Sequence, residues 1–201
     1  LTKFLQHIFR KRTFRELQAD PILNPLRQQD CVVLLPTGAG KSIIYQLAGM
    51  LLPGVTLVID PLVSLIEDQV QGLATYGIDR AVPLSSASAG SRQQRTRLLK
   101  GIERGEYQFI LMSPERLQSP QFRETLRALV QRSQVNLAVI DEAHCISDWG
   151  HDFRPDYIAL SLLAKRYEEV PRIALTATAD KPTRKDIVER LALANGKTAL
   201  P

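Results

Sequence analysis

A short glycine-containing segment beginning at position 37 has the residue types of a loop that binds phosphate. It reads, in order, Thr37, Gly38, Ala39, Gly40, Lys41 and Ser42. It matches the core of the Walker A pattern, although Pro36 stands where that pattern has its first glycine. Gly38 and Gly40 let the backbone turn its N–H groups toward a phosphate, and a helix that begins near Lys41 favours negative charge there. Lys41 would then reach the β- and γ-phosphates, and Ser42 would bind Mg²⁺. Taken alone, the segment is also compatible with an ordinary turn between a strand and a helix.

A second group with chemical potential, Asp141, Glu142 and His144, directly follows an apolar run at residues 137–140. A carboxylate at the end of a strand can hold Mg²⁺ together with Ser42, which is the role expected of Asp141. Glu142 is then placed to orient and deprotonate the attacking water, because hydrolysis needs a base near the metal. We expect His144 to sense the γ-phosphate. The alternative is an acidic strand end that only caps a helix, and it is disfavoured when the same chain also carries a phosphate loop.

These residues need a scaffold that brings distant segments to one place. Short apolar runs alternate with segments of helical periodicity along the chain. The expected strands cover residues 31–35, 55–59, 81–84, 109–112, 137–140 and 173–176. The expected helices cover residues 1–12, a short stretch from 13 toward 20, a segment from 41, and residues 62–76, 92–104, 121–132, 156–167 and 181–191. We expect Pro21 and Pro25 to break the helix before them and Pro61 to be a first helical residue.

Strands that alternate with helices over short connections predict an α/β fold, a parallel sheet with helices on both faces. In such a sheet, ligands bind beyond the carboxyl ends of the strands. Polar segments follow five of the expected strands, at residues 36–42, 60–61, 113–116, 141–144 and 176–178. Their shared position predicts one site assembled from several strand ends.

Length and composition are those of one large domain. The chain has 201 residues and a formal charge of +5, which permits an anionic partner without requiring one. Basic residues gather in the N-terminal segment and at 92–104, where they are either solvated helix faces or nucleic-acid contacts. Cys31 and Cys145 have no spacing typical of zinc or disulfides, so a reducing, intracellular setting is expected. No apolar run approaches about 18 residues and no signal-peptide pattern opens the chain, so we expect no membrane contact.

Several motifs together resemble the first motor domain of superfamily-two helicases: the phosphate loop, the Asp-Glu-Ala-His sequence at 141–144 and the Thr-Ala-Thr sequence at 176–178. The run at 145–157 is similar to the aromatic-rich loop of the RecQ family of DNA helicases, and residues 61–70 and 113–117 are similar to its motifs Ia and Ib. The spacing of that family's adenine-recognising motif is found in Leu5, Phe9, Phe14, Arg15 and Gln18. The resemblance implies a RecA-like P-loop NTPase fold over residues 1–201, with residues 1–30 as the adenine-recognition segment.

The resemblance also implies roles for individual residues. Arg15 and Gln18 would belong to the ATP site, with the Gln18 amide hydrogen-bonded to the adenine edge. Thr176 and Thr178 would couple hydrolysis to domain movement. The side chains expected to contact DNA, or to relay its presence to the phosphates, are Ser64, Arg116, Trp149, His151, Phe153 and Arg154.

Some of these DNA roles have alternatives. Trp149 and Phe153 could be core aromatics under a loop. Arg116 could pair with Glu115 or Glu67.

The activity that the resemblance implies is ATP- and Mg²⁺-dependent translocation on single-stranded DNA, in the 3′ to 5′ direction, with unwinding of duplex DNA. Motors of this kind hydrolyse ATP between two RecA-like domains, and we expect the second domain, with its arginine finger, to be absent from this chain. Because Leu1 is not a methionine, we expect an excised piece. Such a fragment should hydrolyse ATP weakly. The whole protein is expected in the cytoplasm, nucleoid or nucleus, with DNA.

Four positions depart from the family pattern: Arg10, Ala39, Asp60 and Asp148. The added carboxylates of Asp60 and Asp148 should weaken contact with DNA phosphates. They leave room for a second function, an ATP-driven translocase of a nuclease or defence complex that does not unwind duplexes. A third, a non-enzymatic binding module, is disfavoured because it needs neither Lys41 nor Glu142.

Overall fold

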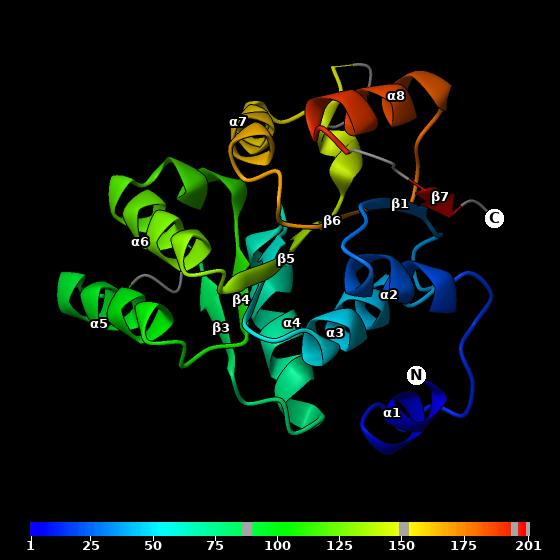
Figure 1. Cartoon of the computed structure of the whole chain (residues 1–201), viewed down its shortest axis with the longest axis horizontal. Helices are drawn as coiled ribbons and strands as arrows, with labels where there is room; N and C mark the ends of the chain where they lie inside the picture. Colours follow the sequence, from blue (N-terminus) through cyan, green and yellow to red (C-terminus); the bar gives the residue numbers. More distant parts are fainter. Residues whose placement is uncertain (86–89, 149–152, 194–196, 200–201) are drawn as a thin grey trace.

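The computed structural model describes residues 1–85, 90–148, 153–193 and 197–199, and its centre is a parallel sheet. The sheet has seven strands in the order β3-β4-β2-β5-β6-β1-β7, and every pairing is parallel. The strands are β1 Cys31–Leu34, β2 Val55–Ile59, β3 Ala81–Leu84, β4 Phe109–Met112, β5 Val135–Ile140, β6 Arg172–Thr176 and β7 Lys197–Ala199. The predicted α/β class is therefore confirmed, with β7 added beside β1 at the edge of the sheet (Figure 1).

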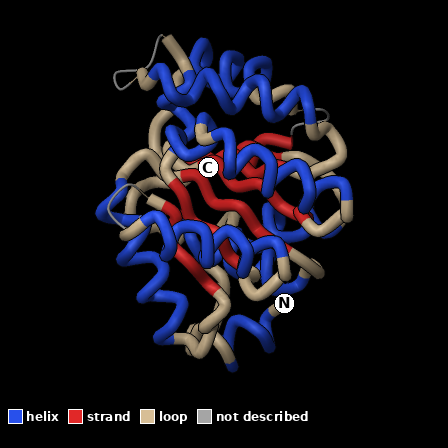
Figure 2. Tube along the Cα trace, turned by 90° about the vertical axis from the view of Figure 1, so that its left-hand side faces the viewer, coloured by secondary structure: helices blue, strands red, loops and turns tan. Residues whose placement is uncertain are grey.

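Helices cover both faces of the sheet (Figure 2). They are α1 Thr2–His7, α2 Ala19–Leu26, α3 Lys41–Leu51, α4 Val63–Thr75, α5 Arg92–Glu103, α6 Pro120–Gln131, α7 Ile158–Arg166 and α8 Lys181–Arg190, with 3₁₀ turns η2 Pro114–Gln118, η3 Ala143–Ile146 and η4 Pro155–Tyr157. None of the helices in the described part of the chain is long and apolar enough to cross a membrane.

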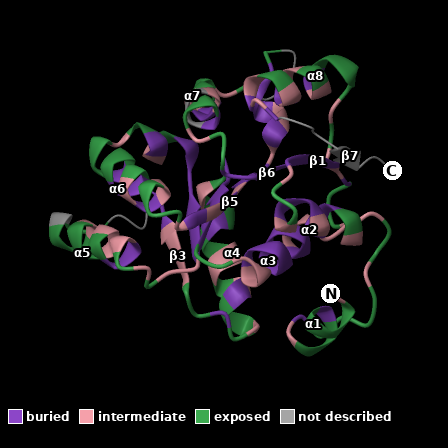
Figure 3. Cartoon of the chain, in the orientation of Figure 1, coloured by how far each residue is buried: buried purple, intermediate pink, exposed green. Residues whose placement is uncertain are grey.

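Two hydrophobic cores lie on opposite faces of the sheet, because alternate strand residues point in opposite directions. Val32 of β1 belongs to the core under α5 to α8, whereas its neighbour Val33 belongs to the core under α1 to α4. The central strands are buried on both sides (Figure 3), as a parallel sheet requires. Each strand end is thereby held rigidly, and the segments after the ends are free to carry polar side chains.

The N-terminal segment differs from the prediction. No helix forms between residues 13 and 18, where Leu17 has a left-handed φ of 62° that a helix does not accommodate. Instead α2 begins at Ala19 and contains both prolines that were expected to break a helix. Pro21 lies in the first turn, where its missing N–H would have no partner in the helix, and Pro25 lies in the last turn, where it removes a single hydrogen bond.

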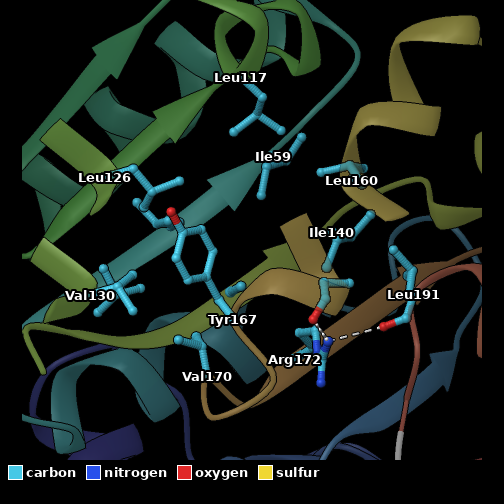
Figure 4. A pocket seen from close by; sticks show the side chains of 14 residues that line it. Ile59, Leu117, Leu126, Val130, Ile140, Leu160, Tyr167, Val170, Arg172 and Leu191 are labelled. Carbon is cyan, nitrogen blue, oxygen red and sulfur yellow. Dashed lines mark hydrogen bonds between the residues drawn. The ribbon is translucent and has the colours of Figure 1, made fainter. Parts of the chain in front are cut away.

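A buried ion pair joins the starts of β1 and β6. Arg172 contacts Asp30 through Nη2 at 3.3 Å, and the backbone N–H of Arg172 donates to Asp30 Oδ1 at 2.7 Å. The same guanidinium donates to the carbonyl oxygens of Ala164 and Leu191 (Figure 4). Beside it, an apolar cavity of about 60 Å³ lies between the sheet and helices α6 and α7, with Ala138 in its lining.

Candidate active site

The phosphate loop runs from the end of β1 to the start of α3. Its glycines adopt left-handed backbone angles, with φ of 78° at Gly38 and 84° at Gly40. A side chain at Gly40 would also collide with Gln18, whose Nε2 would lie 2.6 Å from the added Cβ. α3 starts at Lys41, so the N–H groups of its first turn, which have no partners within the helix, face the loop. The loop thus has the two properties, backbone freedom and a helix N-terminus, that anion binding needs.

Side chains of the N-terminal segment hydrogen-bond to the backbone of this loop. Gln18, only 3% exposed, donates through Nε2 to the carbonyl oxygens of Ala39 at 2.9 Å and Gly40 at 3.1 Å. Its Oε1 accepts the backbone N–H of Arg15 at 2.7 Å, and the Arg15 guanidinium donates to the Gly38 carbonyl oxygen. Both amide hydrogens of Gln18 are therefore bonded to the loop. The expected contact of Gln18 with adenine is not part of this arrangement and would require these bonds to be exchanged.

A hollow of about 440 Å³ opens beside these residues. Its lining includes Lys11, Arg12, Arg15, Gln18 and Ile43. Three cationic side chains at one hollow suit an anionic ligand, and Ile43 offers an apolar surface for a flat ring.

The two carboxylates at the end of β5 differ in their surroundings. Asp141 is 8% exposed, and desolvation raises the pKa of its carboxyl group. Glu142 has a left-handed backbone (φ 46°, ψ 46°), a strained conformation of the kind that persists where the surrounding structure enforces it. The turn aims Glu142 at Lys41, whose Nζ lies 3.4 Å from Glu142 Oε1. The N–H of Glu142 donates to Asp141 Oδ1 at 2.9 Å, which fixes the two residues relative to each other.

His144 links Glu142 to the end of β6. Its Nδ1 lies 3.3 Å from Glu142 Oε2 and 3.0 Å from Thr176 Oγ1. Contacts with the Cys145 sulfur and with the Glu142 carboxylate raise the pKa of His144 to about 10, and the His144 contact lowers the pKa of Glu142. Glu142 is accordingly ionised and His144 protonated at neutral pH.

Thr176 continues this chain of contacts toward Thr178. The Thr176 hydroxyl donates to the Thr178 carbonyl oxygen at 2.9 Å and accepts the Thr178 N–H at 3.3 Å. Side chains from the phosphate loop, from β5 and from β6 are therefore in contact, as the shared position of the strand ends predicted.

Asp60, expected to repel DNA, is buried, with 1% of its surface exposed. Its carboxylate accepts the Leu62 N–H and the Gln69 amide, both at 2.8 Å, and Gln69 accepts the Tyr45 hydroxyl at 2.5 Å. The expectation that this charge faces DNA is wrong, because it lies within a network between α3 and α4.

Asp148 also differs from the expectation. Its carboxylate pairs with the Arg190 guanidinium of α8, so its charge is matched within the chain. No sequence signal connects Asp148 to Arg190, because the partners lie on separate elements.

The residues expected to contact DNA follow three different strands. Ser64 is exposed in the first turn of α4, Arg116 is half-buried in η2, and Phe153 is 36% exposed. Arg154 donates through Nη1 to the Pro61 carbonyl oxygen at 3.0 Å, which joins two of these segments.

Other expectations about DNA contacts have mixed outcomes. Trp149 and His151 lie outside the described residues. Glu115, a possible partner of Arg116, instead accepts a hydrogen bond from Ser113 Oγ at 2.7 Å. The basic helix α5 lies toward the β3 edge of the sheet, away from the phosphate loop after β1 (Figure 1).

Comparisons with known proteins agree with this geometry. The profile of the DEAD/DEAH box helicases matches residues 15–187. "Probable ATP-dependent DNA helicase RecS" of Bacillus subtilis is 46% identical over 193 residues, which are 96% of this chain and 37% of that protein. "ATP-dependent DNA helicase RecQ" of Haemophilus influenzae is 40% identical over 95% of this chain and 30% of its own length. The chain thus spans about a third of the length of these relatives.

Solved structures show the same fold at low sequence identity. The DUF1998 helicase MrfA bound to DNA and AMPPNP is 18% identical, with a TM-score of 0.73 over 96% of this chain and 28% of its own. The Pyrococcus furiosus Hef helicase domain is 17% identical, with a TM-score of 0.64 over 96% of this chain and 38% of its own. These likenesses confirm the expected RecA-like architecture.

Proposed function

The chain belongs to the DEAD/DEAH box helicase family and groups there with RecQ-type helicases, and from that premise we propose that it is the ATP-hydrolysing motor domain of a DNA helicase. The observation that carries the proposal is the continuous contact from Lys41 through Glu142 and His144 to Thr176. A scaffold that only bound nucleic acid would not need a lysine of the phosphate loop and a strained glutamate directed at each other.

In this proposal ATP lies on the phosphate loop, with its phosphates on the N–H groups at the start of α3. Lys41 leaves Glu142 to contact the β- and γ-phosphates, which is a short movement for a flexible side chain. Glu142 then accepts the proton of the attacking water, and the protonated His144 beside it keeps this carboxylate ionised and oriented. Arg15 and the hollow beside it hold the adenine ring of ATP.

Mg²⁺ fits two residues of this site, Asp141 after β5 and Ser42 in the first turn of α3. The ion usually takes one or two protein ligands and completes its shell with phosphate oxygens and water. Asp141 and Ser42 are a ligand set of that kind, and no group of three or more acidic, histidine or cysteine ligands competes for it within the described residues. Burial raises the pKa of Asp141, and a bound cation would relieve that cost. The metal would supply charge neutralisation at the phosphates.

The whole protein is proposed to translocate 3′ to 5′ on single-stranded DNA and to unwind duplexes, with a second RecA-like domain completing the ATP site. The relatives that match are longer and are named as DNA helicases, which supports this proposal and a location with DNA inside the cell. Ser64, Arg116, Phe153 and Arg154 would contact the strand or relay its presence.

The rival proposal, a translocase that does not unwind, rested on two carboxylates near DNA. Asp60 is buried and Asp148 is paired, so neither presents an unmatched charge. That argument against unwinding is therefore weakened.

The test is steady-state ATP hydrolysis by the full-length protein, with and without single-stranded DNA, beside Glu142→Gln and Trp149→Ala. We expect Glu142→Gln to lower the rate by about 10² to 10⁴ while nucleotide binding is kept. Trp149→Ala should keep the DNA-free rate and lose the stimulation by DNA. A strand-displacement assay on a duplex with a 3′ tail then separates unwinding from translocation.

Hydrolysis that survives in Glu142→Gln would refute the assignment of the general base. Hydrolysis that is indifferent to DNA and to Trp149→Ala would refute a DNA-coupled motor.

A further inference from the structure

Side chains of helix α8 bond to three consecutive residues, 146–148, that follow the catalytic carboxylates. Ser147 Oγ donates to Asp186 Oδ2 at 2.7 Å. One turn further along α8, the Arg190 guanidinium donates to the Ile146 carbonyl oxygen at 3.0 Å and to both carboxylate oxygens of Asp148. Because Asp186 and Arg190 are four residues apart, they project from the same face of the helix.

Apolar contacts support these polar ones. Ile187, beside Asp186 in the sequence, is fully buried in the core that also contains Ala143, Cys145 and Ile146. Ser147 is also fully buried. The turn that follows Glu142 therefore packs near α8, and residues 146–148 are bonded to side chains of that helix.

The start of α8 is tied to the other end of the site. The helix is capped by Asp180, whose Oδ1 accepts the Thr183 N–H at 2.9 Å. Asp180 follows Thr178 by two residues, and Thr178 is bonded to Thr176, whose hydroxyl contacts His144. The helix therefore connects to the catalytic segment twice, through the β6 end and through its own side chains.

The segment is also bonded to Arg154, which follows residues 149–152 in the chain. The Arg154 N–H donates to the Cys145 carbonyl oxygen at 3.0 Å. The backbone hydrogen bond holds Cys145, and the α8 contacts hold the next three residues, 146–148. These residues come directly before those expected to sense single-stranded DNA.

We propose that Asp186 and Arg190 are positioning residues that brace residues 146–148, so that DNA contact beyond Asp148 is transmitted to Glu142. The inference rests on the proposed function, and it assigns a role to Asp148 opposite to the one expected from its charge. The carboxylate serves as the anchor for Arg190. An exposed ion pair of this kind adds little to stability. We therefore expect its loss to reduce the stimulation of ATP hydrolysis by DNA.

The first experiment measures ATP hydrolysis by the full-length protein against single-stranded DNA concentration, for wild type, Arg190→Gln, Arg190→Lys and Asp148→Asn. We expect the DNA-free rate to be unchanged and the stimulation by DNA to fall about three- to tenfold in Arg190→Gln. Arg190→Lys should be intermediate, because lysine keeps the charge but loses the two-pronged contact.

Asp148→Asn separates bracing from repulsion. Bracing predicts weaker stimulation, non-additive with Arg190→Gln because the two changes remove one contact. Repulsion predicts tighter DNA binding and stronger stimulation, which would overturn the proposal. Lys185→Gln is the matched control, since this exposed cation of α8 pairs only with Glu189 in the described contacts.

Amide hydrogen exchange tests the brace without relying on the activity. Residues 145–148 and Arg154 should exchange faster in Arg190→Gln than in wild type or Lys185→Gln. Unchanged exchange would refute the brace itself. Faster exchange in a protein whose hydrolysis ignores DNA would refute the proposed function and, with it, the coupling role.

Discussion

Replacing Asp60 with asparagine should change how stability depends on pH. Asp60 is 1% exposed, and desolvation raises its pKa to about 6 from the ordinary value of 3.8. The hydrogen bonds from Leu62 and Gln69 favour the ionised form but offset only part of that desolvation. The folded wild-type protein therefore loses stability when this group ionises, and Asp60→Asn has no such loss.

The sign and size follow from the two pKa values. Because the folded pKa lies above the unfolded one, the stabilising contribution of protonated Asp60 is complete below about pH 4 and is lost as pH rises through about 6. Raising the pKa of Asp60 from 3.8 to about 6 corresponds to about 3 kcal/mol. The stability of Asp60→Asn minus that of wild type should thus rise by about 3 kcal/mol between pH 4 and pH 7.5 and then remain constant.

The amide can replace the protonated acid within the existing network. Its oxygen can accept the Leu62 N–H. The Gln69 amide then has to turn over, so that its oxygen accepts from the new NH₂ group and its nitrogen donates to the Tyr45 hydroxyl, which can act as either donor or acceptor. Strain should therefore not conceal the effect.

Urea unfolding of both proteins at several pH values from 4 to 8 measures the difference directly, and the subtraction cancels titrations that they share. Glu67→Gln, which removes an exposed carboxylate from the same helix α4, is the control for the loss of a carboxylate as such. A flat difference for Asp60→Asn would refute the reasoning, because it would mean that the two hydrogen bonds fully offset burial.

Three further outcomes are expected. Arg172→Met should lower the free energy of unfolding by about 3–5 kcal/mol, since it removes the guanidinium that matches the buried charge of Asp30; in urea unfolding, Asp30→Asn combined with Arg172→Met should lose less than the sum of the single changes. Ala138→Val should add about 0.5–2 kcal/mol by filling the cavity of Figure 4 with a residue that suits a strand; a lower melting temperature would show that the cavity lining cannot accept the methyl groups. Thr176→Val should keep nucleotide affinity and reduce DNA-stimulated hydrolysis about tenfold or less, because His144 loses the hydroxyl at 3.0 Å; an unchanged stimulated rate would contradict a linking role for Thr176.

The sequence was sufficient wherever local pattern and fold agree. Periodicity located the strands from β1 to β6 to within two residues, because buried parallel strands are continuous apolar runs. It also placed the phosphate loop and the segment after β5 at one edge, which Lys41 and Glu142 confirm by their contact.

The sequence was insufficient where contacts between residues far apart in the chain decide the local structure. β7 is short and has no apolar run, and it is defined by its pairing with β1. The α2 helix retains Pro21 and Pro25 because Ile22 packs fully buried in the core beside them, a tertiary gain that outweighs local propensity.

The two acidic departures show why residue type alone misjudged the DNA surface. A carboxylate placed by sequence near a phosphate backbone is expected to repel it, but its effect depends on the groups that surround it. Asp60 is removed from the surface by burial, and Asp148 is matched by a guanidinium whose origin, 42 residues later in the chain, no local pattern reveals. If Asp148 and Arg190 act as one unit, Asp148→Gln should impair this chain, because Arg190 would keep its charge and lose its anchor. A residue that departs from its family is therefore best judged together with the partner that the fold supplies.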